Sequence, residues 1–314
     1  MNRSKSPLSK PPQRKPLPSK PGWRGYLLIA GAAFFWGLSG AVARLLFIRS
    51  GGTPVDPLIL SQTRSSFAFL ILLAYAVAAR RDLLRVSMRD ALGLALLGLG
   101  GIAASNYTYF QALQLTNVTT AILVQYTAPV WIMFYSVLFA GERLTPAKVL
   151  AVALSFTGCF LALGAWQTEV LRLNAVGIAY AFGAAFSFCF FNILGGRMSA
   201  RVNVRTSLLY SLGAATLFWF CVNPPGRIIA AGFGWRDWLT FAGYSLISIL
   251  IPFALYYAGL KWLRPTHAVI TATLEPIFAI FFAFLLVGER ISPFGALGAF
   301  GVVGAVILLQ KRDL

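Results

Sequence analysis

Long apolar runs alternate with short polar connections along nearly the whole chain. Ten such runs follow an initial polar stretch, and each is close to the roughly 20 residues of α-helix that cross a hydrocarbon core. The pattern therefore predicts an all-α membrane protein with ten transmembrane helices. Their approximate ranges are 25–47, 57–79, 91–112, 118–140, 146–165, 174–195, 204–222, 237–258, 266–287 and 293–310.

Residues 1–24 form a polar segment in which basic residues are interspersed with prolines, without apolar periodicity. Such a segment cannot bury enough apolar surface to fold, so we expect a disordered cytoplasmic tail. The apolar run that follows is too long and too continuous for a cleavable signal peptide. We therefore expect it to be retained as the first membrane helix.

Composition excludes a soluble protein. Of the 314 residues, 58% are hydrophobic and 11% are charged, whereas soluble domains carry roughly 25% charged residues. The 27 Lys and Arg residues outnumber the 9 Asp and Glu residues, which gives a formal net charge of +18. In a soluble protein this excess would indicate nucleic-acid binding, so the positions of the basic residues have to be considered.

The basic residues follow the positive-inside rule. With the N-terminus inside, seven lie in the N-terminal segment through Arg24, thirteen in the other inside segments and five in the outside connections. Only Arg44 and Arg64 fall within predicted spans. The charge thus predicts a multi-pass membrane protein with both termini cytoplasmic, and nucleic acid is not needed to explain it. We expect the membrane to be the bacterial inner (plasma) membrane.

The second half of the sequence repeats the first after a shift of 147 residues. Tyr109–Pro146 aligns without gaps on Tyr256–Pro293, and the alignment includes a shared Gly-Glu-Arg triplet and a shared proline. Each half contains five predicted spans, an odd number, so the two halves must have opposite orientation. Inverted repeats of this kind are typical of secondary transporters.

Two motifs resemble the drug/metabolite transporter superfamily, specifically its ten-helix exporters with two EamA domains. They are Pro129…Gly141-Glu142-Arg143-Leu144-Thr145-Pro146 and Glu275-Pro276…Gly288-Glu289-Arg290-Ile291-Ser292-Pro293. The resemblance covers everything after about residue 24 and implies EamA repeats at 25–165 and 174–310. It also implies export of small metabolites such as amino acids or drugs, with both termini cytoplasmic, and says little about the substrate.

Glu275 is the acidic residue predicted deepest in the membrane, near the middle of the ninth span. A carboxylate there costs about 3 kcal/mol on insertion scales, so a function is expected. It could pair with Arg64, carry a coupling proton or hold a cationic substrate group, and the sequence leaves all three open. Arg64, in turn, could reach a substrate carboxylate or serve as the partner of Glu275.

Prolines interrupt three predicted spans, and each removes a backbone hydrogen bond of its helix. Pro129 and Pro276 occupy equivalent positions of the repeat, and Pro252 lies in the eighth span. These prolines could be packing kinks. Alternatively, Pro129 and Pro276 could bend their helices around a central site.

Polar and aromatic residues recur at helical spacing inside several spans. Each could be an interhelical contact, but together they predict a midplane cavity for a small amphiphilic organic molecule. The substrate-binding and coupling candidates are Glu275, Arg64, Trp36, Ser39, Asn106, Tyr109, Gln125, Tyr126, Tyr244, Ser248, Tyr256 and Thr271.

The sequence offers little for an intramembrane enzyme, since it has no HExxH or GxSxG motif, one histidine and no aspartate inside a predicted span. We therefore expect no catalytic residue and no cofactor. Cys159, Cys189 and Cys221 lack CxxC spacing and are interpreted as packing residues, so no metal site is expected. His267 is expected to be solvated at the cytoplasmic interface.

The predicted function is secondary active export of an amino acid or drug-like amphiphile by alternating access. A passive channel or facilitator, or an uptake carrier, is the alternative. The expected partners are the small-molecule substrate, the lipid bilayer and protons as the coupling ion. Both a monomer and a homodimer stay open.

Overall fold

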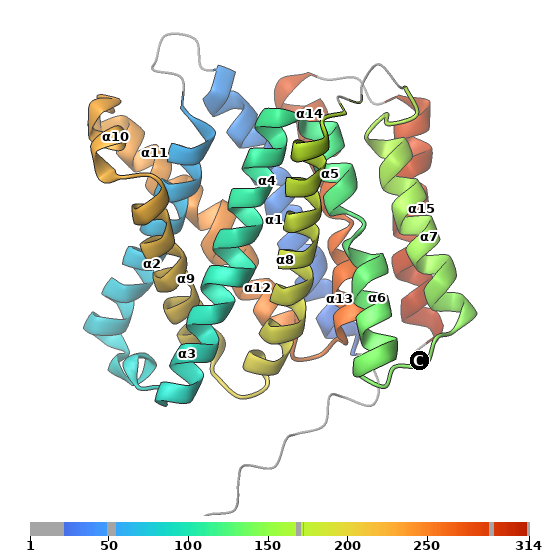
Figure 1. The fold of residues 1–314 in the computed structure, drawn as a ribbon, viewed down its shortest axis with the longest axis horizontal. Helices are drawn as coiled ribbons and strands as arrows, with labels where there is room; N and C mark the ends of the chain where they lie inside the picture. Colours follow the sequence, from blue (N-terminus) through green and yellow to red (C-terminus); the bar gives the residue numbers. More distant parts are fainter. Residues whose placement is uncertain (1–21, 49–54, 168–170, 172, 289–291, 313–314) are drawn as a thin grey trace, which may run out of the picture.

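The computed structural model describes residues 22–48, 55–167, 171, 173–288 and 292–312. Most of the predicted tail, 1–21, lies outside the described residues. The part of the chain that the structure describes is helical, and its long helices stand side by side in one bundle (Figure 1). The predicted all-α fold is confirmed.

The first half makes five passes along the bundle. The third pass contains a π-helical segment, η2, and the fourth is broken into two half-helices. The elements are α1 (Trp23–Ile48), α2 (Pro57–Ala79), the short 3-10 helix η1 (Arg81–Leu84), α3 (Met88–Leu96), η2 (Leu97–Ala103), α4 (Ala104–Leu115), α5 (Val118–Gln125), α6 (Ala128–Phe139) and α7 (Pro146–Ala162).

The second half makes five further passes and has the same irregularities, with the short helix α10 added between its second and third passes. The elements are α8 (Ala175–Ser199), α9 (Val204–Val222), α10 (Pro225–Ala230), α11 (Trp235–Ser245), the π-helical η4 (Leu246–Leu250), α12 (Ile251–Gly259), α13 (Pro265–Ala272), α14 (Glu275–Val287) and α15 (Pro293–Arg312). The ten predicted spans therefore correspond to ten observed passes.

Eight of these passes are long and apolar enough to cross a membrane, counting only the described residues. Of the other two, α7 is apolar but 17 residues long. The second, α9, has 19 residues and packs along α2. Because α1 begins and α15 ends at the same end of the bundle (Figure 1), we call that end the terminal face.

The helix interruptions obey the same 147-residue repeat as the sequence. In the fourth pass, α5 ends at Gln125 and α6 begins at Ala128; in the ninth, α13 ends at Ala272 and α14 begins at Glu275. Pro129 and Pro276 occupy the first turn of the following half-helix, where the missing N–H of proline costs nothing. Each broken pass thus places non-helical backbone midway along the bundle.

The equivalent half-helices pack differently. On the terminal half of the bundle α13 packs against α6. Their repeat equivalents on the opposite half, α5 and α14, are not among the closely packed pairs of described helices. The two halves of the inverted repeat therefore differ in how closely their half-helices pack against those of the other half.

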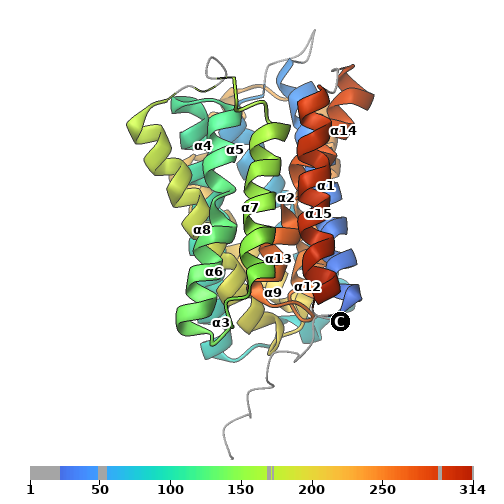
Figure 2. The ribbon, with the colours of Figure 1, turned by 90° about the vertical axis from the view of Figure 1, so that its right-hand side faces the viewer.

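Two glycine contacts show how closely some helices approach. A Cβ atom on Gly37 of α1 would lie 2.6 Å from the Cβ of Phe278 on α14. A Cβ atom on Gly158 of α7 would lie 2.7 Å from the carbonyl oxygen of Gly298 on α15, and Figure 2 shows these two helices side by side. Any larger residue would push the paired helices apart.

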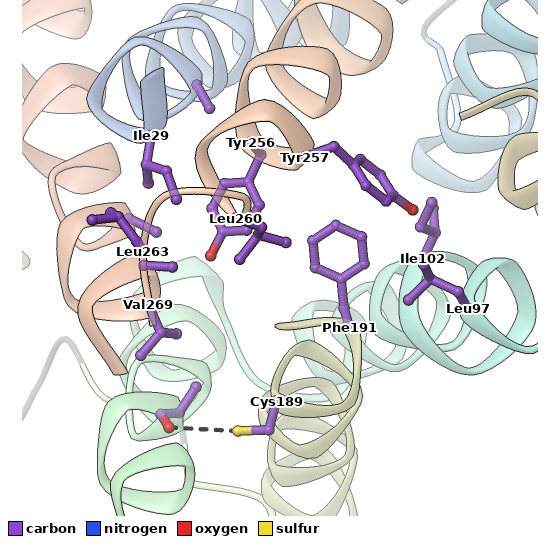
Figure 3. Packing of buried hydrophobic residues seen from close by; sticks show 14 of the residues in the cluster. Ile29, Leu97, Ile102, Cys189, Phe191, Tyr256, Tyr257, Leu260, Leu263 and Val269 are labelled. Atoms are coloured by element: carbon purple, nitrogen blue, oxygen red, sulfur yellow. Dashed lines mark hydrogen bonds between the residues drawn. The ribbon is translucent and has the colours of Figure 1, made fainter. Parts of the chain in front are cut away.

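The core lies between the two halves. Phe191 of α8 packs against Tyr256 and Tyr257 of α12, with ring centroids 5.6 and 5.4 Å away, beside Leu97 and Ile102 of η2 (Figure 3). Both tyrosines are fully buried. Tyr256 belongs both to this aromatic cluster and to the candidate site described below.

Candidate functional site

Glu275 is the first residue of α14, directly after the break in the ninth pass. Its side chain is half-buried. The N-terminus of a half-helix carries partial positive charge, which favours a carboxylate at this position. The repeat equivalent of Glu275 is Ala128, so the acidic group belongs to one of the two breaks.

Four side chains from other passes surround the Glu275 carboxylate. Tyr126, from the break in the fourth pass, interacts with it through its hydroxyl. Tyr109 of α4, Cys159 of α7 and Tyr256 of α12 lie within electrostatic reach. The two broken passes therefore meet at a carboxylate, as in transporters whose discontinuous helices form the central site.

Arg64 of α2 donates a hydrogen bond from its guanidinium to Oδ1 of Asn106 on α4. The Asn106 amide group donates to the carbonyl of Ile102 at 2.7 Å, which fixes its orientation. The guanidinium carbon lies 5.9 Å from the ring centroid of Phe110, and Nε is buried without a hydrogen-bond partner. Asn106 is thus the neutral partner of Arg64.

Arg64 and Glu275 interact electrostatically. Among the ion pairs of the described residues, however, none within 4 Å joins them. Direct pairing, one of the roles open from the sequence, is therefore absent from this structure. Arg64 is held by the neutral side chain of Asn106 instead.

Trp36 of α1 forms an aromatic wall with α12. Its ring centroid lies 5.3 Å from that of Tyr256 and 5.4 Å from that of Phe253. The Tyr256 hydroxyl donates a 2.7 Å hydrogen bond to Oδ1 of Asn192 on α8. Asn192 was not among the predicted candidates, although a fully buried asparagine in an apolar run is a signal that could have identified it.

Three predicted hydroxyl candidates bond to their own helices rather than presenting free donors. Ser39 donates to the carbonyl of Trp36 at 2.9 Å, Ser248 to that of Tyr244 at 2.7 Å, and Thr271 to that of His267 at 2.7 Å. All three are buried.

The remaining candidates lie at helix junctions. The Tyr244 hydroxyl donates to the Ser39 carbonyl at 3.2 Å and so ties α11 to α1. Gln125 is half-buried as the last residue of α5. Pro252 follows η4 as the second residue of α12, so a π-helical segment, rather than a break, precedes this proline.

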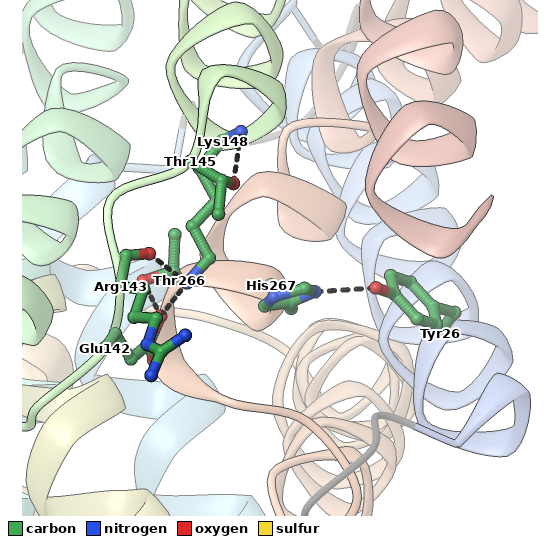
Figure 4. A network of polar contacts seen from close by, with 7 residues as sticks. All are labelled: Tyr26, Glu142, Arg143, Thr145, Lys148, Thr266 and His267. Atoms are coloured by element: carbon green, nitrogen blue, oxygen red, sulfur yellow. Dashed lines mark hydrogen bonds and ion pairs between the residues drawn. The ribbon is translucent and has the colours of Figure 1, made fainter. Parts of the chain in front are cut away.

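A second polar cluster lies near the terminal face (Figure 4). Lys148 of α7 forms a 2.8 Å ion pair with Glu142, and the two residues are only 5% and 8% exposed. Lys148 also donates to the Arg143 carbonyl at 3.1 Å, and Thr266 of α13 donates to Glu142 at 3.3 Å. The connection between α6 and α7 is thereby bonded to α13.

The prediction for His267 is wrong. This side chain is 1% exposed, and its Nδ1 lies 2.6 Å from the hydroxyl of Tyr26 on α1. The N-terminal turn of α1 covers it, which no pattern within α13 could reveal. Thr145 caps α7, because its hydroxyl accepts a hydrogen bond from the Lys148 N–H at 3.3 Å.

Inverted five-pass halves, two pairs of half-helices and an intramembrane carboxylate where they meet define a membrane transporter. Comparison with known proteins agrees. The EamA-like transporter family matches residues 23–164 and again residues 175–310. The chain belongs to this family, with two EamA domains, as its motifs predicted.

Two similar proteins are transporters by name. An uncharacterized transporter of Archaeoglobus fulgidus is 28% identical over 278 residues, which cover 88% of this chain and 93% of that protein. The uncharacterized inner membrane transporter YicL of Salmonella typhimurium is 23% identical over 291 residues, with 91% and 95% covered. A solved crystal structure, 20% identical, superimposes with a TM-score of 0.71 over 92% of this chain and 98% of its own.

Proposed function

We propose that this transporter exports a small organic metabolite, an amino acid or drug-like amphiphile, by alternating access and proton coupling. The observation that carries the proposal is the unequal packing of equivalent half-helices, in which α13 packs closely on α6 whereas α5 and α14 are not among the closely packed pairs of described helices. In an inverted repeat, exchange of these two arrangements converts a protein open on one side into one open on the other.

Polar contacts close the terminal side in this arrangement. Opening there requires α13 to break the hydrogen bond between Thr266 and Glu142. Directly after α13, at the helix break, the Thr273 hydroxyl lies 3.0 Å from that of Ser155 on α7. By the 147-residue repeat, Gly295 is the equivalent of Lys148, and Thr120 is the equivalent of His267. The opposite side therefore lacks the equivalents of this lysine and this histidine, and the two gates have different chemistry.

The basic residues support a cytoplasmic terminal face, because most of those outside the predicted spans belong to connections on that side. The structure would then be closed toward the cytoplasm. The relative YicL, named as an inner membrane transporter, supports the same membrane. Export is the direction that the family resemblance favours.

Glu275 is the group best placed for proton coupling. It lies at the junction of the two broken passes, is half-buried, and interacts with Tyr126 of the other break. Gain or loss of a proton by the Glu275 carboxylate changes the contact between the breaks of the fourth and ninth passes, which are the segments that must move. The aromatic wall of Trp36 and Tyr256 would hold the apolar part of the substrate.

A cross-link between α7 and the residue that follows α13 tests alternating access. In a variant lacking the native cysteines, Ser155→Cys and Thr273→Cys would replace two side chains in direct contact. We expect oxidation to stop counterflow of L-phenylalanine or phenethylamine in proteoliposomes, and reduction to restore it. Each single-cysteine variant is the control. Full counterflow through the cross-linked protein, or transport of neither probe by the uncross-linked protein, would overturn the proposal.

A further inference from the structure

A cavity of about 410 Å³ lies at the terminal face, away from the candidate site between the broken passes. Its walls come from the connection between α6 and α7, the first turn of α7, the residue before α13 and the last turns of α15. The volume is within the roughly 300–1,000 Å³ of small-molecule sites. We call it the basic cavity, because Arg143, Lys148 and Arg264 line it.

The positive charge of the basic cavity is not balanced by the residues around it. Lys148 pairs with Glu142, and Figure 4 shows Arg143 beside this buried pair. Neither Arg143 nor Arg264 forms an ion pair within 4 Å with an acidic group of the described residues. No acidic side chain is among the described residues that line the cavity. An anion in contact with both guanidinium groups would reduce their repulsion.

The start of α7 adds hydrogen-bond donors to the same cavity. Thr145 and Ala147 line it at the first turn of this 17-residue helix. The first N–H groups of a helix have no partner within the helix, and they attract anions. A phosphate group accepts hydrogen bonds from such N–H groups and bidentate bonds from arginine, so it matches the donors that two arginines and a helix start provide together.

Apolar side chains lie next to the basic cavity on the outer surface of the bundle. Leu144 precedes the Thr145 cap, Val149 and Leu150 belong to the first turns of α7, and all three are exposed. In a membrane-spanning bundle, exposed apolar side chains of this kind contact acyl chains. A phospholipid can therefore place its phosphate in the cavity and its chains along α7, whereas a free phosphate ion uses only the polar contacts. Basic pockets between membrane helices are suited to anionic headgroups.

We propose that the phosphate group of an anionic phospholipid, of the phosphatidylglycerol type, binds in the basic cavity between Arg143 and Arg264. Arg143 belongs to the connection between α6 and α7, and Arg264 is the N-cap residue of α13. A headgroup on both side chains reinforces the hydrogen bond by which Thr266 holds α13 to Glu142 of that connection. Bound lipid thus favours the closed terminal side, and this consequence, unlike the binding, rests on the proposed function.

Titration of the purified full-length protein with lipids, followed by native mass spectrometry, tests the binding. The probes are phosphatidylglycerol and phosphatidylcholine with identical acyl chains. We expect tighter binding of phosphatidylglycerol, and a loss of about five-fold in its affinity in each of Arg143→Gln and Arg264→Gln. The matched controls are Arg81→Gln and Lys261→Gln, which remove exposed basic residues outside the cavity and should keep the wild-type affinity.

Three results would overturn the site. They are equal affinity of the wild-type protein for the two lipids, unchanged phosphatidylglycerol affinity in both arginine variants, and equal losses in the variants and the controls. Inorganic phosphate at the concentration of the lipid should not displace it, because the ion lacks acyl chains. Displacement under that condition would overturn the assignment to a lipid. Arg264→Lys, which keeps the charge but loses the bidentate geometry, should give an intermediate loss and guards against misfolding of the glutamine variant.

Disulfide formation between Ser155→Cys and Thr273→Cys tests the consequence for the gate. In the protein without native cysteines, we expect faster cross-linking in phosphatidylglycerol nanodiscs than in phosphatidylcholine nanodiscs. The addition of Arg143→Gln and Arg264→Gln should abolish the difference. Tight phosphatidylglycerol binding with equal cross-linking rates in the two lipids would refute the effect on the gate. Failure of the transport proposal is distinguishable, because the lipid titration involves no substrate and no transport.

Discussion

Lys148 and Glu142 form a 2.8 Å ion pair that is buried near the terminal face and bonded through Thr266 to α13. The second half of the protein has Gly295 in place of the lysine. The pair therefore distinguishes two otherwise equivalent ends of an inverted repeat, and it stabilises the arrangement in which α13 packs against α6.

Removal of one partner of this pair should destabilise the protein more than removal of both. Lys148→Met leaves an uncompensated buried carboxylate, which costs about 3–5 kcal/mol. We expect a fall of several degrees in thermal unfolding of the purified protein, and partial recovery in Lys148→Met/Glu142→Gln. Strictly additive losses in the double variant would show that the two side chains are not coupled.

Tyr256→Phe should reduce both stability and transport. Loss of its hydroxyl leaves the buried Asn192 oxygen without its donor, at a cost of about 1–3 kcal/mol, and alters the wall beside Trp36. The matched control is Tyr257→Phe, because the neighbouring hydroxyl bonds to Ser211 at 3.1 Å, away from Glu275. We expect the control to lose stability, by thermal unfolding, but to keep the wild-type apparent affinity in counterflow. Equal transport defects in both variants would show that Tyr256 has no specific role in the candidate site.

Gly37→Ala should lower both the stability and the transport activity of the protein, although alanine favours helix formation. Its Cβ would lie 2.6 Å from Phe278 and 2.7 Å from the backbone nitrogen of Ala279, so α1 and α14 must separate. Gly40→Ala, in the same helix with nothing within 4 Å of the added carbon, should gain up to about 1 kcal/mol. Thermal unfolding and counterflow of the two variants compare the positions directly. A Gly37→Ala protein as stable and active as Gly40→Ala would contradict the close packing of α1 on α14.

The features that the sequence predicted are those that depend on the residues of a single segment. Hydropathy located the ten passes, and the repeated prolines located the two helix breaks, because both depend on local backbone and solvent preferences. Glu275 stood out because a carboxylate at that depth is costly.

What the sequence did not predict depends on lateral contacts between distant segments. His267 is buried by Tyr26, which lies 241 residues earlier, and Tyr256 bonds to Asn192, 64 residues away. Lys148 looked like a cytoplasmic charge because its partner Glu142 and the covering helix α13 come together only in the folded bundle. Periodicity within one helix carries no information about which neighbour faces it.

Uphill flux in proteoliposomes tests the central claim, proton-coupled transport through Glu275, most directly. With an imposed pH gradient we expect the wild-type protein to accumulate L-phenylalanine above its external concentration, and a protonophore to abolish that accumulation. Glu275→Gln should show no gradient-driven accumulation. Flux by the wild-type protein that only dissipates the substrate gradient, or an unchanged pH response in Glu275→Gln, would contradict the claim.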